Sequence, residues 1–170
     1  MMTNDTVCIA RVPSPVGELM LVGERREQGV ALRGIYFADA AHAAAGVPPG
    51  AKEDPSAFMA VIAQLAAYFD GKRTSFELEL DPIGTPFQRD VWCALASIPY
   101  GSTTTYAEIA RSIGRPSASR AVGAANGKNP LSIVVPCHRV IGRDGTLTGY
   151  AGGVANKRVL LDLEARIAQL

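Results

Sequence analysis

The stretch Ile133-Val134-Val135-Pro136-Cys137-His138-Arg139-Val140 decides how the rest of the chain is interpreted. A run of β-branched residues before a proline predicts a short buried strand over residues 131–135. Pro136 has no N–H to donate, so the strand is expected to end there. Cys137 would then lie partly exposed at the rim of packed structure. The imidazole and guanidinium that follow it favour a thiolate, and so predict a nucleophile.

The same stretch also has a purely structural interpretation. A lone cysteine is more often a small buried hydrophobic residue than a nucleophile. The pair His138-Arg139 after a strand is often only a polar turn. The features of the C-terminal half described below favour chemistry at Cys137.

Length and charge predict two small units. The chain has 170 residues and 48% of them are hydrophobic, which is enough for a packed core. Residues 1–83 hold 7 Lys and Arg against 11 Asp and Glu, a net −4, and residues 84–170 hold 10 against 5, a net +5. Any polyanion is therefore expected to bind the second unit, although such a charge is also common in proteins that bind no nucleic acid.

The cysteine and histidine content predicts a reducing, cytoplasmic location and no metal site. Cys8, Cys93 and Cys137 show no paired spacing, which argues against a disulfide framework. His42 and His138 are the only histidines, and His42 is expected on a surface loop. No signal peptide is recognised at the N-terminus and no apolar run is long enough to cross a membrane.

The first half reads as strands followed by a helix. Apolar stretches over residues 7–12, 18–23 and 30–37, joined by short loops, predict an antiparallel meander. Helical spacing of apolar residues over 55–69 predicts a helix that covers this sheet. The Pro- and Gly-rich segment 81–86 predicts a domain boundary, so the domains are expected at 1–83 and 84–170.

The second half begins with helical patterns. Apolar spacing over residues 87–98 predicts a helix in which Trp92 packs inward and Cys93 is structural. Thr105 and Glu108 form a capping-box pattern at the start of the next helix. A tight turn follows, and Ser117 is expected to cap a short helix that ends near residue 126. Two short helices joined by a Gly-containing turn predict a helix-turn-helix.

The second of these helices is almost free of bulky side chains, and Arg120 is its one long cation. A face of small residues can approach another surface closely, and Arg120 could then contact phosphate or enter the base stack of DNA. Equally, the small residues could pack this helix tightly on its own domain while Arg120 reaches solvent. The small residues are Ala118, Ala121, Gly123, Ala124 and Ala125.

The C-terminal segment offers further polar candidates. The Gly-rich stretch over residues 142–153 predicts a small β-wing or a flexible loop, in which Tyr150 could wall a flat pocket or simply be exposed. A last helix is predicted over residues 154–168. Glu164 lies beside the apolar stripe of this helix, and a carboxylate that points inward needs a partner. His138 is a candidate partner; otherwise Glu164 is an ordinary solvated residue.

Around Pro136-Cys137-His138-Arg139-Val140 the chain resembles the O6-alkylguanine-DNA alkyltransferases, the methylated-DNA–protein-cysteine methyltransferase family. The resemblance is strong over residues 84–165 and weak before them, where it rests mainly on residues 14–19. Its further motifs are Ser102 to Tyr106, Ser119-Arg120-Ala121-Val122-Gly123, Lys128-Asn129-Pro130, Gly149-Tyr150-Ala151-Gly152-Gly153 and Leu160 to Glu164.

The resemblance implies a role for each matching residue in alkyl transfer. Cys137 would accept the alkyl group, His138 would act on it through a bound water, and Glu164 would orient His138. Tyr106 would protonate the guanine, and Asn129 would hold the turn before the active-site strand. The backbone groups of Cys137, Val140 and Ala151 would read the base, and Tyr106 and Tyr150 would also line its pocket.

The resemblance also implies how DNA is bound. Arg120 would fill the space left by a flipped nucleotide while the second helix of the helix-turn-helix enters the minor groove. The residues expected to contact DNA are Arg120, Ala118, Ser119, Ala121, Gly123, Lys128 and Arg139.

The fold implied is α+β. The first domain would be a ribonuclease-H-like small antiparallel sheet with a helix, mainly structural, and the second a helical, winged helix-turn-helix-like domain that carries the cysteine. Some family members bind zinc in the first domain, but here Cys8 and His42 alone predict no metal, and no cofactor is expected.

The function implied is direct repair of O6-alkylguanine in double-stranded DNA by a free monomer that reacts once. The size of alkyl group accepted and any action on O4-alkylthymine stay open. The alternatives are a sensor that binds alkylated DNA without transfer, and a Cys-His hydrolase that turns over.

Overall fold

The computed structural model describes residues 6–170, apart from the side chains of Ala41 and His42. Residues 1–5 belong to the N-terminal segment in which no signal peptide is expected, and they lie outside the described residues. Two units follow one another along the chain, the first ending at Ile83 and the second spanning Gly84–Leu170. In the described part of the chain no helix is both long and apolar enough to span a lipid bilayer.

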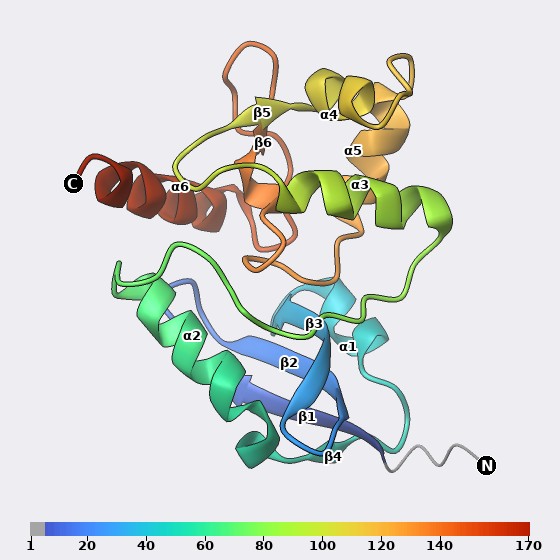
Figure 1. Cartoon of the computed structure of the whole chain (residues 1–170), viewed down its shortest axis with the longest axis vertical. Helices are drawn as coiled ribbons and strands as arrows, with labels where there is room; N and C mark the ends of the chain where they lie inside the picture. Colours follow the sequence, from blue (N-terminus) through green and yellow to red (C-terminus); the bar gives the residue numbers. More distant parts are fainter. Residues whose placement is uncertain (1–5) are drawn as a thin grey trace. The chain divides into compact units, whose positions relative to one another are not determined.

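The first unit contains the predicted meander. Strands β1 (Val7–Val12), β2 (Leu19–Arg25) and β3 (Val30–Phe37) pair antiparallel in sequence order (Figure 1). The two-residue strand β4 (Lys52–Glu53) adds to β1 in parallel, so the sheet order is β3-β2-β1-β4. The meander predicted from three apolar stretches joined by short loops is confirmed.

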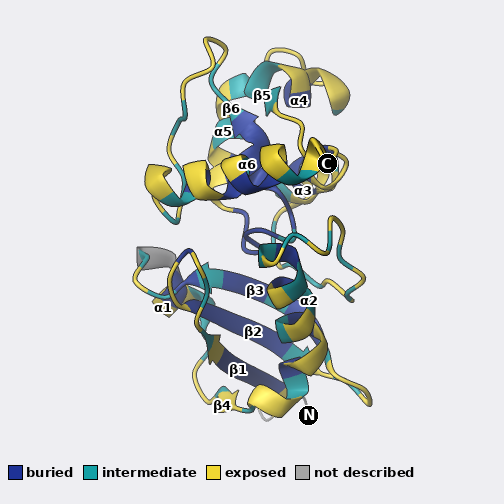
Figure 2. Ribbon diagram, turned by 90° about the vertical axis from the view of Figure 1, so that its left-hand side faces the viewer, coloured by how far each residue is buried: buried dark blue, intermediate teal, exposed yellow. Residues whose placement is uncertain are grey.

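Both faces of this sheet are covered. One face carries a cluster of Val7, Ile9, Met20 and Val22, and Tyr36 packs against it. The turn η2 (Pro55–Phe58) leads into helix α2 (Met59–Phe69), which runs along the sheet and buries Val61, Leu65 and Tyr68 (Figure 2). A buried sheet under one helix is a sufficient core for a unit of this size.

The expected surface loop around His42 is wrong. Helix α1 (Ala41–Gly46) occupies part of residues 40–50. Four of its six residues are alanine, which has the highest helix propensity. The His42 side chain lies outside the described residues.

The second unit is mainly helical. Trp92 is buried and its Nε1–H donates to the carbonyl of Ala125 at 2.9 Å, which joins the first helix of the unit to the third. Cys93 is exposed and not packed in the core of the unit, and its expected lack of a chemical role stays a prediction. The helices are α3 (Pro86–Ala96), α4 (Tyr106–Ser112), α5 (Ser119–Gly127) and α6 (Val154–Ala168).

Helices α4 and α5 form the predicted helix-turn-helix. Thr105 caps α4 through the predicted capping box: its side chain accepts from the N–H of Glu108, and Glu108 accepts from the N–H of Thr105. The cap predicted at Ser117 is wrong, because α5 begins after Ala118 with no side-chain cap.

A small parallel ladder completes the second unit. Strand β5 (Thr104–Thr105) precedes α4 and pairs with β6 (Val140–Ile141), which follows the short turn η3 (Cys137–Arg139). Beyond β6 the chain makes a tight turn closed by the Gly142 N–H to Thr146 carbonyl hydrogen bond at 2.8 Å. The predicted α+β class is confirmed, with a small sheet in the first unit and a helical second unit.

Candidate active site

The segment that leads to Cys137 is a buried turn, so the strand predicted over residues 131–135 is wrong. The Asn129 side chain closes this turn: Nδ2 donates to the carbonyl of Val135 at 2.9 Å, and Oδ1 accepts from the N–H of Leu131 at 3.0 Å. Ile133 has a φ of 75°, a left-handed conformation that a β-branched residue rarely adopts. Packing of the apolar side chains has overridden their preference for extended backbone.

Cys137 is almost completely buried, at 4% exposure, and the expectation that it is partly exposed is wrong. Burial raises the pKa of its thiol, while a hydrogen bond from Asn129 and the charge of Lys157 act in the opposite direction. Burial is the largest of these effects, so Cys137 rests as a thiol. Its reaction as a nucleophile needs a base to remove the proton.

His138 and Glu164 meet inside the second unit. Nε2 of His138 lies 2.7 Å from Oε1 of Glu164, and both side chains are buried. Burial lowers the pKa of His138 and outweighs the opposing effect of Glu164, so the imidazole is neutral at neutral pH. It therefore donates its Nε2–H to Glu164 and keeps Nδ1 as an acceptor. Nδ1 is buried and has no partner among the described residues.

Arg139 supports the same carboxylate. Its Nε and Nη2 contact the two oxygens of Glu164 at 2.8 and 2.9 Å, and Nη1 donates to the carbonyl of Ile98 at 2.7 Å. The guanidinium also lies 5.5 Å from the ring centre of Tyr100. Burial by itself would raise the pKa of Glu164, but the hydrogen bonds and charges of His138 and Arg139 lower it to about 2. Arg139 is buried, and this placement corrects the expected DNA contact.

Lys157 is a site residue that sequence reasoning missed. Its side chain is fully buried, and Nζ donates to the carbonyl of Val140 at 2.6 Å and reaches that of Thr148 at 3.4 Å. One ammonium thus joins β6 to the Gly-rich loop that follows it. The available signal was spacing, because Lys157, Leu160 and Glu164 lie three and four residues apart on one face of α6.

The expected base-pocket residues come from separate elements of this unit. Tyr106 is half-buried at the start of α4, and its hydroxyl lies 2.5 Å from Oγ1 of Thr148 in the Gly-rich loop. Val140 is buried, Tyr150 is half-buried and Ala151 is exposed. Because β5 pairs with β6, the residue after β5, Tyr106, is held beside the strand that carries Val140.

The expected DNA-contacting residues lie on or beside α5. Arg120, Ala121 and Lys128 are exposed, whereas Ala118, Ser119 and Gly123 are half-buried. A Cβ placed on Gly123 would lie 3.8 Å from the ring of Tyr106, so α5 passes close to the base-pocket side of α4. The helix-turn-helix and the candidate pocket are therefore neighbours within one unit.

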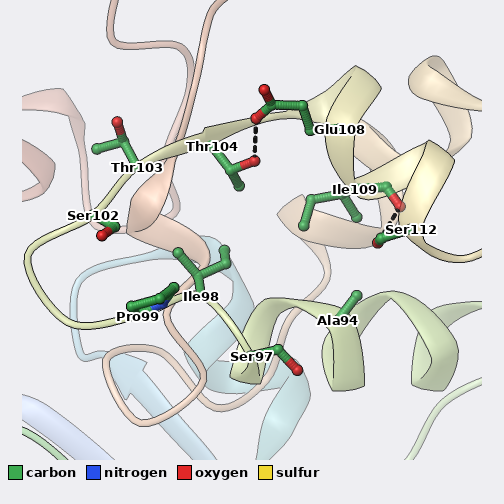
Figure 3. Close-up of a pocket in the computed structure, with 10 residues that line it drawn as sticks. All are labelled: Ala94, Ser97, Ile98, Pro99, Ser102, Thr103, Thr104, Glu108, Ile109 and Ser112. Atoms are coloured by element: carbon green, nitrogen blue, oxygen red, sulfur yellow. Dashed lines mark hydrogen bonds between the residues drawn. The ribbon is translucent and has the colours of Figure 1, made fainter.

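A groove of about 420 Å³ opens elsewhere on the second unit (Figure 3). It is lined largely by hydroxyl-bearing and small side chains from the end of α3, the following loop and α4. Thr104 donates to Oε2 of Glu108 at 2.5 Å at its edge. None of the residues expected to take part in chemistry lines it, so this groove is separate from the candidate active site.

The residues present offer little for a metal ion. Among the described residues no three His, Cys, Asp or Glu side chains gather in a way that could hold one. Cys8, half of the pair considered in the first unit, is buried, and its thiol lies 3.6 Å from the carbonyl of Gly23.

Comparisons with known proteins point to one family. Residues 86–166 match the family described as "6-O-methylguanine DNA methyltransferase, DNA binding domain", and residues 9–82 match "6-O-methylguanine DNA methyltransferase, ribonuclease-like domain". The chain is 50% identical over 155 residues to the methylated-DNA–protein-cysteine methyltransferase of Mycolicibacterium paratuberculosis, which covers 91% of this chain and 90% of that protein.

Solved structures agree. The crystal structure of Mycobacterium tuberculosis O6-methylguanine methyltransferase is similar with a TM-score of 0.83 and 47% identity, covering 94% of this chain and 93% of that one. A crystal structure of Mycobacterium tuberculosis OGT in complex with DNA gives the same TM-score and identity, with 92% of each chain covered.

Proposed function

The chain belongs to the 6-O-methylguanine DNA methyltransferase family, and from this premise we propose that it repairs DNA by transferring the alkyl group of O6-alkylguanine to Cys137. One observation supports this assignment of residues: His138, which directly follows the buried Cys137, forms a buried pair with Glu164. A thiol that rests protonated needs a base, and a neutral imidazole oriented by a carboxylate is such a base.

The structure supports proton removal by Nδ1 of His138. Nε2 donates to Glu164, so Nδ1 carries the lone pair, and it is buried without a partner among the described residues. We propose that a water molecule joins the Cys137 thiol to Nδ1, because buried acceptors of this kind are normally satisfied. The positive charge that forms on the imidazole is stabilised by Glu164, which stays ionised because its pKa is about 2.

The transfer step balances without a cofactor. The sulfur of Cys137 attacks the alkyl carbon, a carbon–sulfur bond forms, and the carbon–O6 bond breaks with its electron pair passing to guanine. The thiol proton goes to His138, and Tyr106 donates a proton to the guanine ring as that charge develops. The products are a thioether on Cys137 and an unmodified guanine.

The product explains why each molecule should react once. An acyl or phosphoryl group on sulfur can be hydrolysed, whereas an alkyl thioether has no comparable route back to the thiol. The protein would therefore be consumed one molecule per lesion.

Recognition of the base is assigned to the neighbouring elements. The backbone of Cys137, Val140 and Ala151 would read the flipped guanine, and Tyr106 and Tyr150 would line its pocket. Asn129 is proposed to hold the turn under Cys137, which its two hydrogen bonds support. A base buried in duplex DNA cannot reach a buried thiol without flipping.

DNA binding is assigned to α5. Exposure of Arg120 and Lys128 and the small side chains around Arg120 support close approach to a minor groove, with Arg120 in the space left by the flipped nucleotide. The partner proposed is double-stranded DNA, and the free protein is proposed to be a monomer. Because the reaction needs a reduced thiol, we place it in a reducing compartment such as the cytoplasm.

A titration tests the proposal. The protein is mixed with increasing amounts of duplex oligonucleotide that carries one O6-methylguanine, and its mass is followed by mass spectrometry. We expect a gain of one methyl group on the peptide that contains Cys137, with repair ending at one lesion per protein. Cys137→Ala should bind the duplex and gain no methyl group, whereas Cys93→Ser, with the exposed thiol removed, should react like the parent protein.

The same titration separates the two alternatives. A sensor would bind the duplex without any gain of mass. A Cys-His hydrolase would continue past one equivalent, and Glu164 beside His138 would supply the orienting group that such a hydrolase needs. Either result would overturn the proposed transfer to Cys137.

A further inference from the structure

The hydroxyl of Tyr106 is in hydrogen-bond contact with a second hydroxyl, that of Thr148. Tyr106 Oη and Thr148 Oγ1 are 2.5 Å apart, a short hydrogen bond in which either atom could be the donor. The two residues come from different elements, since Tyr106 is the first residue of α4 and Thr148 lies in the Gly-rich loop after β6. This contact therefore fixes the end of the phenol against a loop that has no regular structure of its own.

The backbone of Thr148 is itself held by Lys157. Its carbonyl lies 3.4 Å from Nζ of Lys157, which also holds the carbonyl of Val140 at 2.6 Å. Lys157 is fully buried on α6, so a rigid helix anchors the part of the loop that carries Thr148. The chain of contacts Lys157–Thr148–Tyr106 gives the phenol one defined position.

The direction of the hydrogen bond follows from the proposed reaction. If Tyr106 is to give its proton to guanine, that proton must point to the base, so the phenol oxygen must act as the acceptor toward Thr148. A hydrogen bond donated to an oxygen becomes stronger when that oxygen gains negative charge. The Thr148 hydroxyl would therefore stabilise the phenolate as the proton leaves.

We propose that Thr148 is a positioning residue for alkyl transfer, which donates its hydroxyl hydrogen bond to Tyr106 and so aims and assists the proton that Tyr106 gives to the leaving guanine. This inference rests on the proposed function. In the step the phenol O–H bond breaks and a guanine N–H bond forms, while the proton of Thr148 stays on its own oxygen. The phenolate afterwards regains a proton from solvent.

The test is a double-mutant cycle on the rate of a single transfer from methylated duplex DNA. Thr148→Val removes the hydroxyl at nearly constant volume and should slow transfer by about tenfold to a hundredfold, the range for one hydrogen bond to a charged group. Thr148→Ser should restore most of the rate. In a Tyr106→Phe background, Thr148→Val should cause no further loss, because the hydroxyl it acts on is already gone.

Two controls separate this role from loosening of the loop. Thr146→Val removes a hydroxyl on the same loop that bonds Asp144 and not Tyr106, and it should leave the transfer rate unchanged. Alkylation of Cys137 by iodoacetamide needs no protonated leaving group, so Thr148→Val should react with it at the parent rate. Thr148→Ala, which is smaller, repeats the comparison if Thr148→Val folds poorly.

Failure of the role of Thr148 and failure of the proposed function give different results. Additive losses in the cycle, a Thr148→Ser protein as slow as Thr148→Val, or equal slowing by Thr146→Val would overturn the role of Thr148. Failure of the parent protein to gain a methyl group on Cys137 would instead overturn the proposed function.

Discussion

Arg139 and Glu164 form a buried ion pair in which two guanidinium nitrogens face the two carboxylate oxygens at 2.8 and 2.9 Å. Breaking such a pair leaves an uncompensated buried charge, so Arg139→Met should lower the free energy of unfolding by about 3–5 kcal/mol. Urea denaturation measures the change. Arg143→Met removes an exposed cation four residues later and should stay within about 0.5 kcal/mol of the parent. Equal stability of Arg139→Met and the parent would contradict the pair's structural role.

Arg120 is expected to matter for duplex DNA and not for the free base. Arg120→Ala should slow transfer from methylated duplex by at least about tenfold, because unstacking a base costs a few kcal/mol and the side chain stabilises the flipped state. Reaction with free O6-alkylguanine should be unchanged. Lys128→Ala, which removes a nearby exposed cation, should instead weaken duplex binding and reduce its salt dependence. Equal slowing with duplex and free base would exclude the role in flipping.

Asn129 should be important for stability as well as for the site. Asn129→Ala removes a donor to the carbonyl of Val135 and an acceptor for the N–H of Leu131, both buried. The N–H of Leu131 is left unsatisfied, while the carbonyl of Val135 keeps only the N–H of Cys137 at 2.8 Å, so the free energy of unfolding should fall by about 1–3 kcal/mol. Thermal and urea unfolding check this. Lys128→Ala, an exposed neighbour, is the control, and a similarly small effect at both positions would show that the turn does not depend on Asn129.

Acid should destabilise the fold through the buried pair. The pKa of Glu164 is about 2 in the folded protein, against an ordinary value of 4.5. A carboxyl group whose pKa is lowered by folding stabilises the folded state at any pH above its pKa in the unfolded chain. This contribution amounts to about 3 kcal/mol, and it is lost as pH falls from about 4.5 to 2. The pKa of His138 is also lowered, so its contribution begins to fall below pH 6.5. Unfolding in urea at several pH values should show stability declining in both ranges.

The rate of alkyl transfer should depend on pH through the titration of His138. The proposed base is the neutral imidazole, and burial lowers its pKa below the ordinary value of 6.5. The rate should therefore be constant near pH 7 and fall in acid with a midpoint below 6.5. Single-transfer rates with an O6-alkylguanine free base report this without DNA binding. A rate that rises as pH falls below 6 would argue against a neutral imidazole as the base.

Local patterns predicted most of the regular structure. The meander followed from apolar stretches joined by short loops. The start of α4 followed from Thr105 and Glu108, because capping is a local hydrogen-bonding pattern. The strand predicted over residues 131–135 is wrong because packing, and not local preference, decides the backbone there. Its β-branched side chains favour extended backbone, but the Asn129 side chain and burial of Ile133 close the run into a turn. A preference for strand gives way when packing demands another backbone.

The site was only partly predictable. His138 could be matched with Glu164 because an inward carboxylate needs a partner, and the structure brings the two together. The DNA contact expected for Arg139 came from the family resemblance alone, and the residue that it pairs with lies 25 positions away on α6. Lys157 and Thr148 were missed because their contacts to Val140 and Tyr106 are nonlocal.

Burial of Cys137 has a further consequence if, as proposed, the protein reacts only once. Such a protein has to survive storage in the cell with its acceptor intact, and oxidants attack thiolates that they can reach. Cys137 is 4% exposed and burial raises its pKa, which shields it on both counts. Cys93 is exposed, so we expect peroxide to reach it before Cys137. The proposed acceptor should therefore react slowly with oxidants and keep its thiol until a flipped base reaches it.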